Sequence, residues 1–68
     1  MTKTQATLSA KRVLAYGYHQ PDSGHVWAAC PRCHEHVTCA HTPTASVPQR
    51  VASLRTELVT HLTEGCPA

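Results

Sequence analysis

The chain has few of the side chains that usually build a hydrophobic core. It contains no phenylalanine, one tryptophan (Trp27) and two tyrosines (Tyr16 and Tyr18) among its 68 residues. Only about a dozen apolar side chains are available for burial, which is too few to outweigh chain entropy comfortably. We therefore expect at most one domain, and a domain of this size is marginal without a cross-link such as a bound metal ion.

Long apolar runs are also missing. No run approaches membrane-spanning length, so we expect no membrane anchor. The first stretch, MTKTQATLSAKR, lacks the apolar segment of a secretory signal. A cytoplasmic location is the resulting expectation. In that reducing setting the four cysteines favour metal binding, and two disulfides are the alternative.

Charge of either sign is sparse. Six lysines and arginines stand against four aspartates and glutamates, which gives a formal net charge of +2. A zinc ion bound by three thiolates would lower this charge to about +1. Such a small positive charge is a weak electrostatic footprint for a nucleic-acid-binding protein, although it does not exclude one.

Metal-ligand spacing is the strongest signal in the sequence. In CPRC, two cysteines separated by two residues are able to chelate one ion from a tight turn. In HLTEGC, a histidine and a cysteine separated by four residues follow a helical pattern. Zinc accepts three thiolates and one imidazole in a tetrahedral structural site. We therefore predict a structural zinc site whose ligands are Cys30, Cys33, His61 and Cys66.

Turn residues and alternation predict an antiparallel sheet before the helix. We expect a disordered tail over residues 1–10 and a first strand over residues 11–19. QPDSG, residues 20–24, is typical of a hairpin turn. A second strand is expected over residues 25–30, and a third is a candidate over residues 34–41. It stays open whether the first strand belongs to the sheet.

The helix near the carboxyl end carries the clearest local signals. Ser46 with Gln49 forms a capping box, and Pro48 is tolerated in the first turn. Gly65 is expected to end the helix in the left-handed conformation and to direct the chain back toward the metal. The prediction is a helix from about residue 47 to 64. Residues at helical spacing form one stripe: Val47, Val51, Leu54, Leu58, His61 and Leu62.

These elements together predict a small α+β zinc-stabilised domain. Its two- or three-stranded antiparallel sheet is followed by one C-terminal helix, and the domain covers residues 11–68. A histidine on an apolar helix face is more often a core residue than a ligand. The cysteines upstream and downstream of His61 reverse that preference.

Other cysteines and histidines compete for the metal. Cys39 lies six residues of strand beyond Cys33, a span of roughly 20 Å, so we interpret it as a small buried apolar residue. His34 and His36 are close enough to CPRC to compete for the metal. Because the chain after Cys33 is expected to run away from the ion, we keep these two histidines only as alternative ligands. Three further histidines border turns and are expected to be solvated: His19, His25 and His41.

The pattern of CPRC, a long gap and HLTEGC after a capped helix resembles the zinc-finger superfamily in which a β-hairpin knuckle faces a helix. The nearest in spacing are Cys-Cys-His-Cys variants and BED-type fingers. The resemblance covers residues 25–66. It departs from the common DNA-reading finger in its longer gap and in an extra strand expected before the knuckle.

The resemblance implies nucleic-acid binding, with DNA as the favoured partner and regulation of transcription as the setting. Helix-start residues would read bases, and a knuckle cation would contact phosphate. The residues that this assigns to nucleic acid are Arg32, Gln49, Arg50 and Ser53, with Lys11 and Arg12 as further phosphate contacts.

A protein-interaction zinc module without nucleic-acid binding is the alternative function. Tyr16, Tyr18 and Trp27 are residue types that dominate interface energetics. We favour core packing of these aromatics against the helix over an exposed patch. An unpaired first strand would also offer an edge to a partner strand.

Enzymatic activity is not expected. HEH, residues 34–36, lacks the helical spacing of a zinc protease motif. Four protein ligands leave the zinc no open position for water or substrate.

Overall fold

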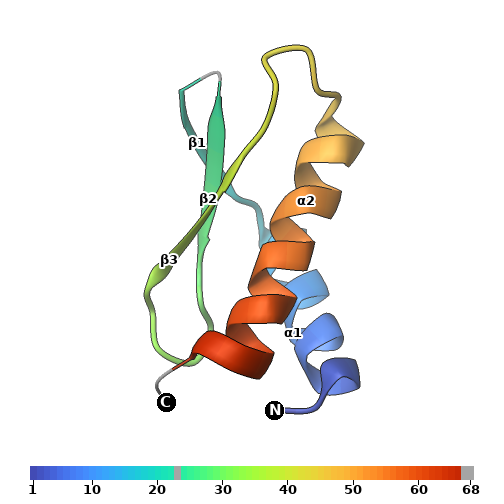
Figure 1. Ribbon diagram of the computed structural model, residues 1–68, viewed down its shortest axis with the longest axis vertical. Helices are drawn as coiled ribbons and strands as arrows, with labels where there is room; N and C mark the ends of the chain where they lie inside the picture. Colours follow the sequence, from blue (N-terminus) through green and yellow to red (C-terminus); the bar gives the residue numbers. More distant parts are fainter. Residues whose placement is uncertain (23, 67–68) are drawn as a thin grey trace.

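The computed structural model describes residues 1–22 and 24–66. A three-stranded sheet forms one layer and two helices lie together on one side of it (Figure 1). The predicted α+β class with an antiparallel sheet and a C-terminal helix is confirmed, and a second helix precedes the sheet. The elements in chain order are α1 (Lys3–Tyr16), β1 (His19–Asp22), β2 (His25–Ala29), β3 (His36–Ala40), α2 (Val47–Thr60) and the π-helical turn η1 (His61–Gly65).

The amino-terminal helix α1 corrects the prediction for this part of the chain. Residues 3–10, expected to be a tail, and most of the expected strand over residues 11–19 lie in this helix. Thr2 accepts a hydrogen bond from the amide of Gln5, whose side chain in turn accepts from the amide of Thr2, so the helix begins with a capping box. Ala6 and Ala10, one helical turn apart, are fully buried. The helix ends at Gly17, whose φ of 123° is accessible mainly to glycine.

Sheet order is β1-β2-β3, with both neighbouring pairs antiparallel. The stretch QPDSG was expected to be only a turn, but three of its residues, 20–22, belong to β1. The Asp22 carboxylate accepts from the amide of Gly24 at 2.7 Å, which tightens the connection to β2. In the second pair Val26 lies opposite Cys39 and Ala28 opposite Val37, and these residues face the helices.

The core lies between the sheet and the helix pair. The buried side chains of α1 are alanines, which allow the two helices to approach closely. The buried side chains of α2 and η1 are leucines. No polar or charged residue among the described ones is buried. The buried residues are Ala6, Ala10, Val26, Ala28, Cys30, Val37, Leu54, Leu58 and Leu62. These small side chains give little apolar burial for a domain of this length.

The outer face of the sheet carries three stacked rings, one from each strand. Trp27 lies between His19, at a centroid distance of 4.0 Å, and His36, at 3.7 Å. Interplanar angles of 17° and 19° make both contacts parallel stacks. The prediction that Trp27 packs against the helix is therefore wrong, because β2 directs its side chain to the opposite face from Val26 and Ala28.

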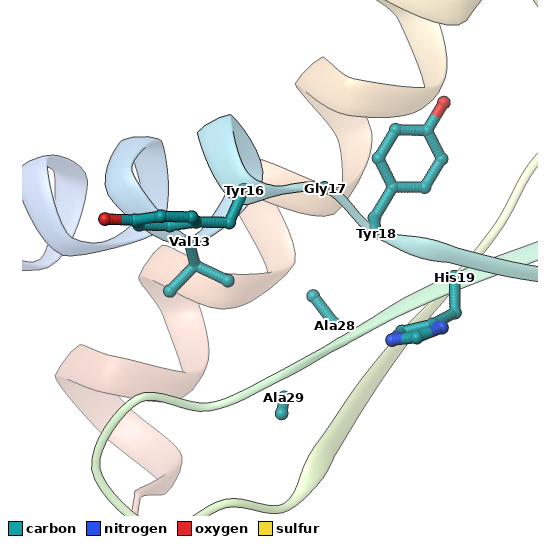
Figure 2. Close-up of a pocket in the computed structure, with 7 residues that line it drawn as sticks. All are labelled: Val13, Tyr16, Gly17, Tyr18, His19, Ala28 and Ala29. Atoms are coloured by element: carbon teal, nitrogen blue, oxygen red, sulfur yellow. The ribbon is translucent and has the colours of Figure 1, made fainter.

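The two tyrosines behave differently from each other. Tyr16 is 96% exposed, so its predicted core packing is also wrong, whereas Tyr18 packs against the core. Figure 2 shows Tyr18 and His19 pointing to opposite sides of the chain, with Tyr16 at the end of α1. The hollow between them, about 430 Å³, has Ala28 and Ala29 on one side. This hollow lies where β1 diverges from β2 to join α1.

The helix α2 begins as predicted but ends differently. Ser46 and Gln49 make the reciprocal capping bonds, at 3.4 Å to the Ser46 hydroxyl and 2.8 Å to the Gln49 carbonyl. Gly65 was expected to have positive φ, but it lies within η1 and is not among the positive-φ residues of the described chain. A π-turn therefore replaces the expected glycine cap. None of the helices in the described ranges is long and apolar enough to cross a membrane.

Candidate metal centre

A tight turn between β2 and β3 holds the first two predicted ligands. The amide of Cys30 donates to the carbonyl of Glu35 at 2.8 Å, and the amide of His34 donates to the carbonyl of Cys30 at 3.0 Å. His34 adopts a left-handed φ of 65°, which is uncommon for a residue with a Cβ. These bonds fold the chain so that the side chains of Cys30 and Cys33 leave the turn on the same side.

The second half of the cluster comes from the end of the helical segment. His61 begins η1, and its amide donates to the carbonyls of Glu57 and Leu58. The wider π-turn carries the chain to Cys66, whose backbone is extended with φ −78° and ψ 123°. Single π-turns within helices occur often at functional sites. Here the turn lets a histidine and a cysteine five positions apart reach the same point.

The four predicted ligand atoms converge. One atom from each of the four residues lies within 4.8 Å of all the others. Sγ of Cys30 is 3.8 Å from Sγ of Cys66, and Sγ of Cys33 is 3.2 Å from Nε2 of His61. Ligands about 2.0–2.3 Å from a tetrahedral ion are separated by roughly 3.3–3.8 Å. The arrangement is a possible metal-binding site, and the members of this four-ligand cluster are Cys30, Cys33, His61 and Cys66.

Thiol pairing as disulfides does not describe the cluster. All four cysteines are free, and the Cys30–Cys66 sulfur separation of 3.8 Å is well beyond a bond of about 2.05 Å. The burial of Cys30 is complete, while Cys33, His61 and Cys66 are partly exposed. An ion at the centre would therefore be covered on the core side and accessible from the surface.

Backbone amides around the turn favour a thiolate at Cys30. Burial alone raises the pKa of this thiol, but the amides of Cys33 and Arg32 and the neighbouring thiols lower its pKa to about 7. The Arg32 amide lies 3.4 Å from the sulfur. At Cys33 the amide of Glu35 lowers the pKa, yet burial and the sulfurs of Cys30 and Cys66 together raise it. The Cys30 thiol is therefore readily deprotonated near neutral pH, whereas the Cys33 thiol would lose its proton only on binding a metal cation.

The competing residues lie elsewhere. His36 stacks on Trp27 on the outer face of the sheet, and His34 is exposed at the turn. The Cys39 thiol donates to the carbonyl of Ala40 at 3.4 Å, and burial followed by the charge of Glu57 raises its pKa. Within the described part of the chain, no second group of possible ligands comes together.

The residues predicted to contact nucleic acid come from three parts of the fold. Arg32 lies in the turn beside the cluster, at the end of the molecule where η1 finishes, and Arg50 lies in the first turn of α2. Arg50 lies eleven positions before His61, roughly 16 Å along the helical segment. Ser53 and Gln49 are exposed on α2, although Gln49 is engaged in the capping box. Lys11 and Arg12 lie on α1 rather than on a strand.

Arg50 has an intramolecular role that the sequence did not indicate. Its guanidinium donates to the side-chain carbonyl of Gln20 at 3.1 Å and to the carbonyl of Pro43 at 3.5 Å. These bonds join the start of α2 to β1 and to the loop before the helix. The contact spans 30 positions in the sequence, so only the folded chain reveals it. Gln49 and Arg50, two of the three side chains predicted to read bases, are thus engaged within the fold.

Comparison with known proteins adds no assignment: no family model, curated protein or solved structure matches this chain.

Proposed function

We propose that the chain is a structural zinc-binding module in which one zinc ion joins the turn between β2 and β3 to the end of η1. The observation that carries this proposal is the convergence of four ligand atoms within 4.8 Å, from segments separated by 27 residues of chain between Cys33 and His61. Three thiols and one imidazole at this spacing match the ligand set and the geometry of a tetrahedral structural zinc site.

Donor chemistry favours zinc over calcium and magnesium. Three thiolates and one imidazole are soft and borderline ligands, which suit zinc and not calcium or magnesium. Four protein donors fill a tetrahedral shell, so the ion keeps no position for water or substrate. We therefore assign the site a structural role, and the expectation that the chain is not an enzyme stays part of the proposal.

Because the core is small, the free energy of zinc binding would add substantially to the stability of the fold. Binding to a site that forms only in the folded chain adds its free energy to folding, on the order of 10 kcal/mol in small zinc modules. The core of this chain is built largely from alanine, valine and leucine, which limits what burial contributes. Zinc would supply the remaining stability by fixing both ends of the β3–α2 segment.

DNA binding in a small regulatory protein stays a prediction. The residues proposed for it are Arg32, Gln49, Arg50 and Ser53, and the low net charge predicts weak affinity for a single module. Binding to a protein partner is the alternative. A cytoplasmic location likewise stays a prediction.

The decisive experiment measures zinc stoichiometry by native mass spectrometry and folding by circular dichroism, with and without a chelator. We expect one zinc per chain and loss of structure on chelation. Cys66→Ser should lose zinc and structure, whereas Cys39→Ser, a matched cysteine outside the cluster, should retain both. A wild-type chain that is folded and metal-free would overturn the proposal.

A further inference from the structure

A groove runs along the surface where α1 and α2 lie side by side, on the side away from the sheet. Two hollows of about 380 and 220 Å³ occupy it, and both are lined by Arg55. Lys3 shares the first hollow with Val59, and Lys11 shares the second with Val51. The start of α1 therefore meets the end of α2, and the helices are antiparallel. The four-ligand cluster is not part of this groove.

Three cations border the groove without carboxylate partners. Among residues 1–22 and 24–66, the one ion pair joins Asp22 to His25 at the hairpin, so Lys3, Lys11 and Arg55 have none. Glu64 borders a separate hollow with Lys3 at one end of the groove but makes no ion pair with it. The remaining described carboxylates lie by the sheet or on the far side of α2, as the influence of Glu57 on Cys39 shows. The groove thus concentrates half of the lysines and arginines of a weakly charged chain.

Aliphatic side chains and threonines lie between these cations. The Thr7 hydroxyl donates to the carbonyl of Lys3 at 2.8 Å, and the Thr56 hydroxyl donates to the carbonyl of Ala52 at 3.1 Å. These two hydroxyl protons are therefore used within their own helices, and the half-buried Val51 and Val59 add aliphatic surface to the groove. The three cations could bind phosphate as well as carboxylate, but the aliphatic side chains between them match the apolar face of a partner and have no role against a phosphate backbone.

We propose that this groove binds an acidic amphipathic helix of a protein partner. Such a helix would place apolar side chains into the two hollows on either side of Arg55, and its carboxylates would face the bordering cations. Lys3 and Lys11 are eight residues apart, a separation of about 12 Å along α1. Glutamates two helical turns apart on the partner match that separation. The charge complementarity favours an acidic helix over a neutral or basic one.

The test uses a synthetic peptide of about 16 residues, long enough for four helical turns. It carries leucines on one face and glutamates beside them, and it is titrated into the ¹⁵N-labelled, folded full chain. Zinc content and circular dichroism are recorded first, so failure of the zinc site is seen separately from failure of the groove. We expect saturable shifts at the amides of Thr7, Lys11, Arg55 and Val59.

Charge-reversal variants provide the matched comparison. Lys11→Glu and Arg55→Glu should each weaken peptide binding about five- to tenfold. Arg12→Glu makes the same charge change on the adjacent residue of α1, outside the groove, and should change binding less than about twofold. A peptide with glutamine in place of glutamate should bind more weakly to the wild-type chain.

Three results would overturn the proposal. One is the absence of saturable shifts at the groove in a folded chain. Another is an equal loss of binding in Arg12→Glu, which would show a response to net charge alone. The third is tighter binding of duplex DNA than of the peptide at the same groove residues, which would assign the surface to nucleic acid instead.

Discussion

The two ends of α2 are held in place by different kinds of contact. At its carboxyl end, η1 brings His61 and Cys66 to the turn of β2 and β3, where sulfur and nitrogen ligands converge within 4.8 Å. At its amino end, the capping box of Ser46 and the hydrogen bonds of Arg50 join the helix to its neighbours. Exposed hydrogen bonds each contribute about 1 kcal/mol, whereas a structural metal contributes several times more. With the proposed zinc bound, we infer that the stability of the molecule is concentrated at the carboxyl end of α2.

Removal of the metal should have the largest effect. His61→Ala or chelation deletes the cross-link at the carboxyl end of α2, and we expect cooperative folding to be lost. Thermal unfolding followed by circular dichroism measures this effect. Cys39→Ser serves as the control, with an expected loss of at most about 1 kcal/mol. Equal stability of His61→Ala and the wild-type chain would contradict the inference that the carboxyl end of α2 contributes more stability than the amino end.

Acidification should release the metal before it affects the amino end of the helix. Zinc binds thiolates, and the Cys30 thiol has a pKa of about 7, so protons compete increasingly as the pH falls below that value. The raised pKa of Cys33 means that metal binding also displaces a proton there near neutral pH. Zinc affinity should therefore fall with falling pH. A chromogenic zinc indicator in an acid titration measures the release, and release that is independent of pH would contradict this assignment of ligands.

Loss of the helix cap should have an intermediate effect. Ser46→Ala leaves the amide of Gln49 without its side-chain acceptor, and such substitutions cost about 1 kcal/mol. Chemical denaturation of the zinc-loaded chain measures the change, with Ser53→Ala on the exposed surface of the same helix as the control. A cost comparable to that of metal removal would show that both ends contribute equally.

Arg50→Ala should reduce stability by roughly 0.5–1 kcal/mol, because its bonds to Gln20 and Pro43 are exposed. The same variant examines the DNA prediction. If Arg50 reads DNA, binding of a duplex should weaken by more than the stability change explains and should depend steeply on salt. Titration of a fluorescent duplex at two salt concentrations separates these outcomes, with Arg55→Ala as a second variant on the same helix.

The smallest effect is expected at His34. Its left-handed backbone costs a residue with a Cβ about 1 kcal/mol, which glycine avoids. His34→Gly removes this cost, but glycine loses more entropy on folding and offsets part of the gain. The expected net stabilisation of the zinc-loaded chain is therefore a few tenths to about 1 kcal/mol. Zinc stoichiometry should stay the same. Loss of zinc in this variant would identify His34 as a ligand and revise the cluster.

Local patterns in the sequence were sufficient for the parts of the fold that local physics determines. Spacing in CPRC and HLTEGC identified the residues that converge, and the capping box of Ser46 located the start of α2. An equivalent box, Thr2 with Gln5, stands at the start of α1, but the alternation over residues 11–19 favoured a strand there. The buried face of α1 relies on Ala6 and Ala10, which give a weak apolar pattern and became decisive only through contact with α2.

Features that depend on contacts between distant residues could not be predicted from local sequence patterns. The bond between Arg50 and Gln20, the π-turn at His61 and the stack of Trp27 with two histidines each require strands or helices to be in place first. Trp27 was predicted to face the core because of its side-chain type. The alternation along β2 instead places Trp27 on the outer face of the sheet.

The stack on the outer face of the sheet gives the molecule an internal optical reporter. Trp27 is the only indole in the chain, and an imidazole from each neighbouring strand covers one of its two ring faces. Its emission therefore depends on whether β1 and β3 both hold their register with β2, on the side of the sheet remote from the four ligands. Separation of either edge strand would uncover one ring face and change the light emitted, so a single unmodified side chain records the order of all three strands.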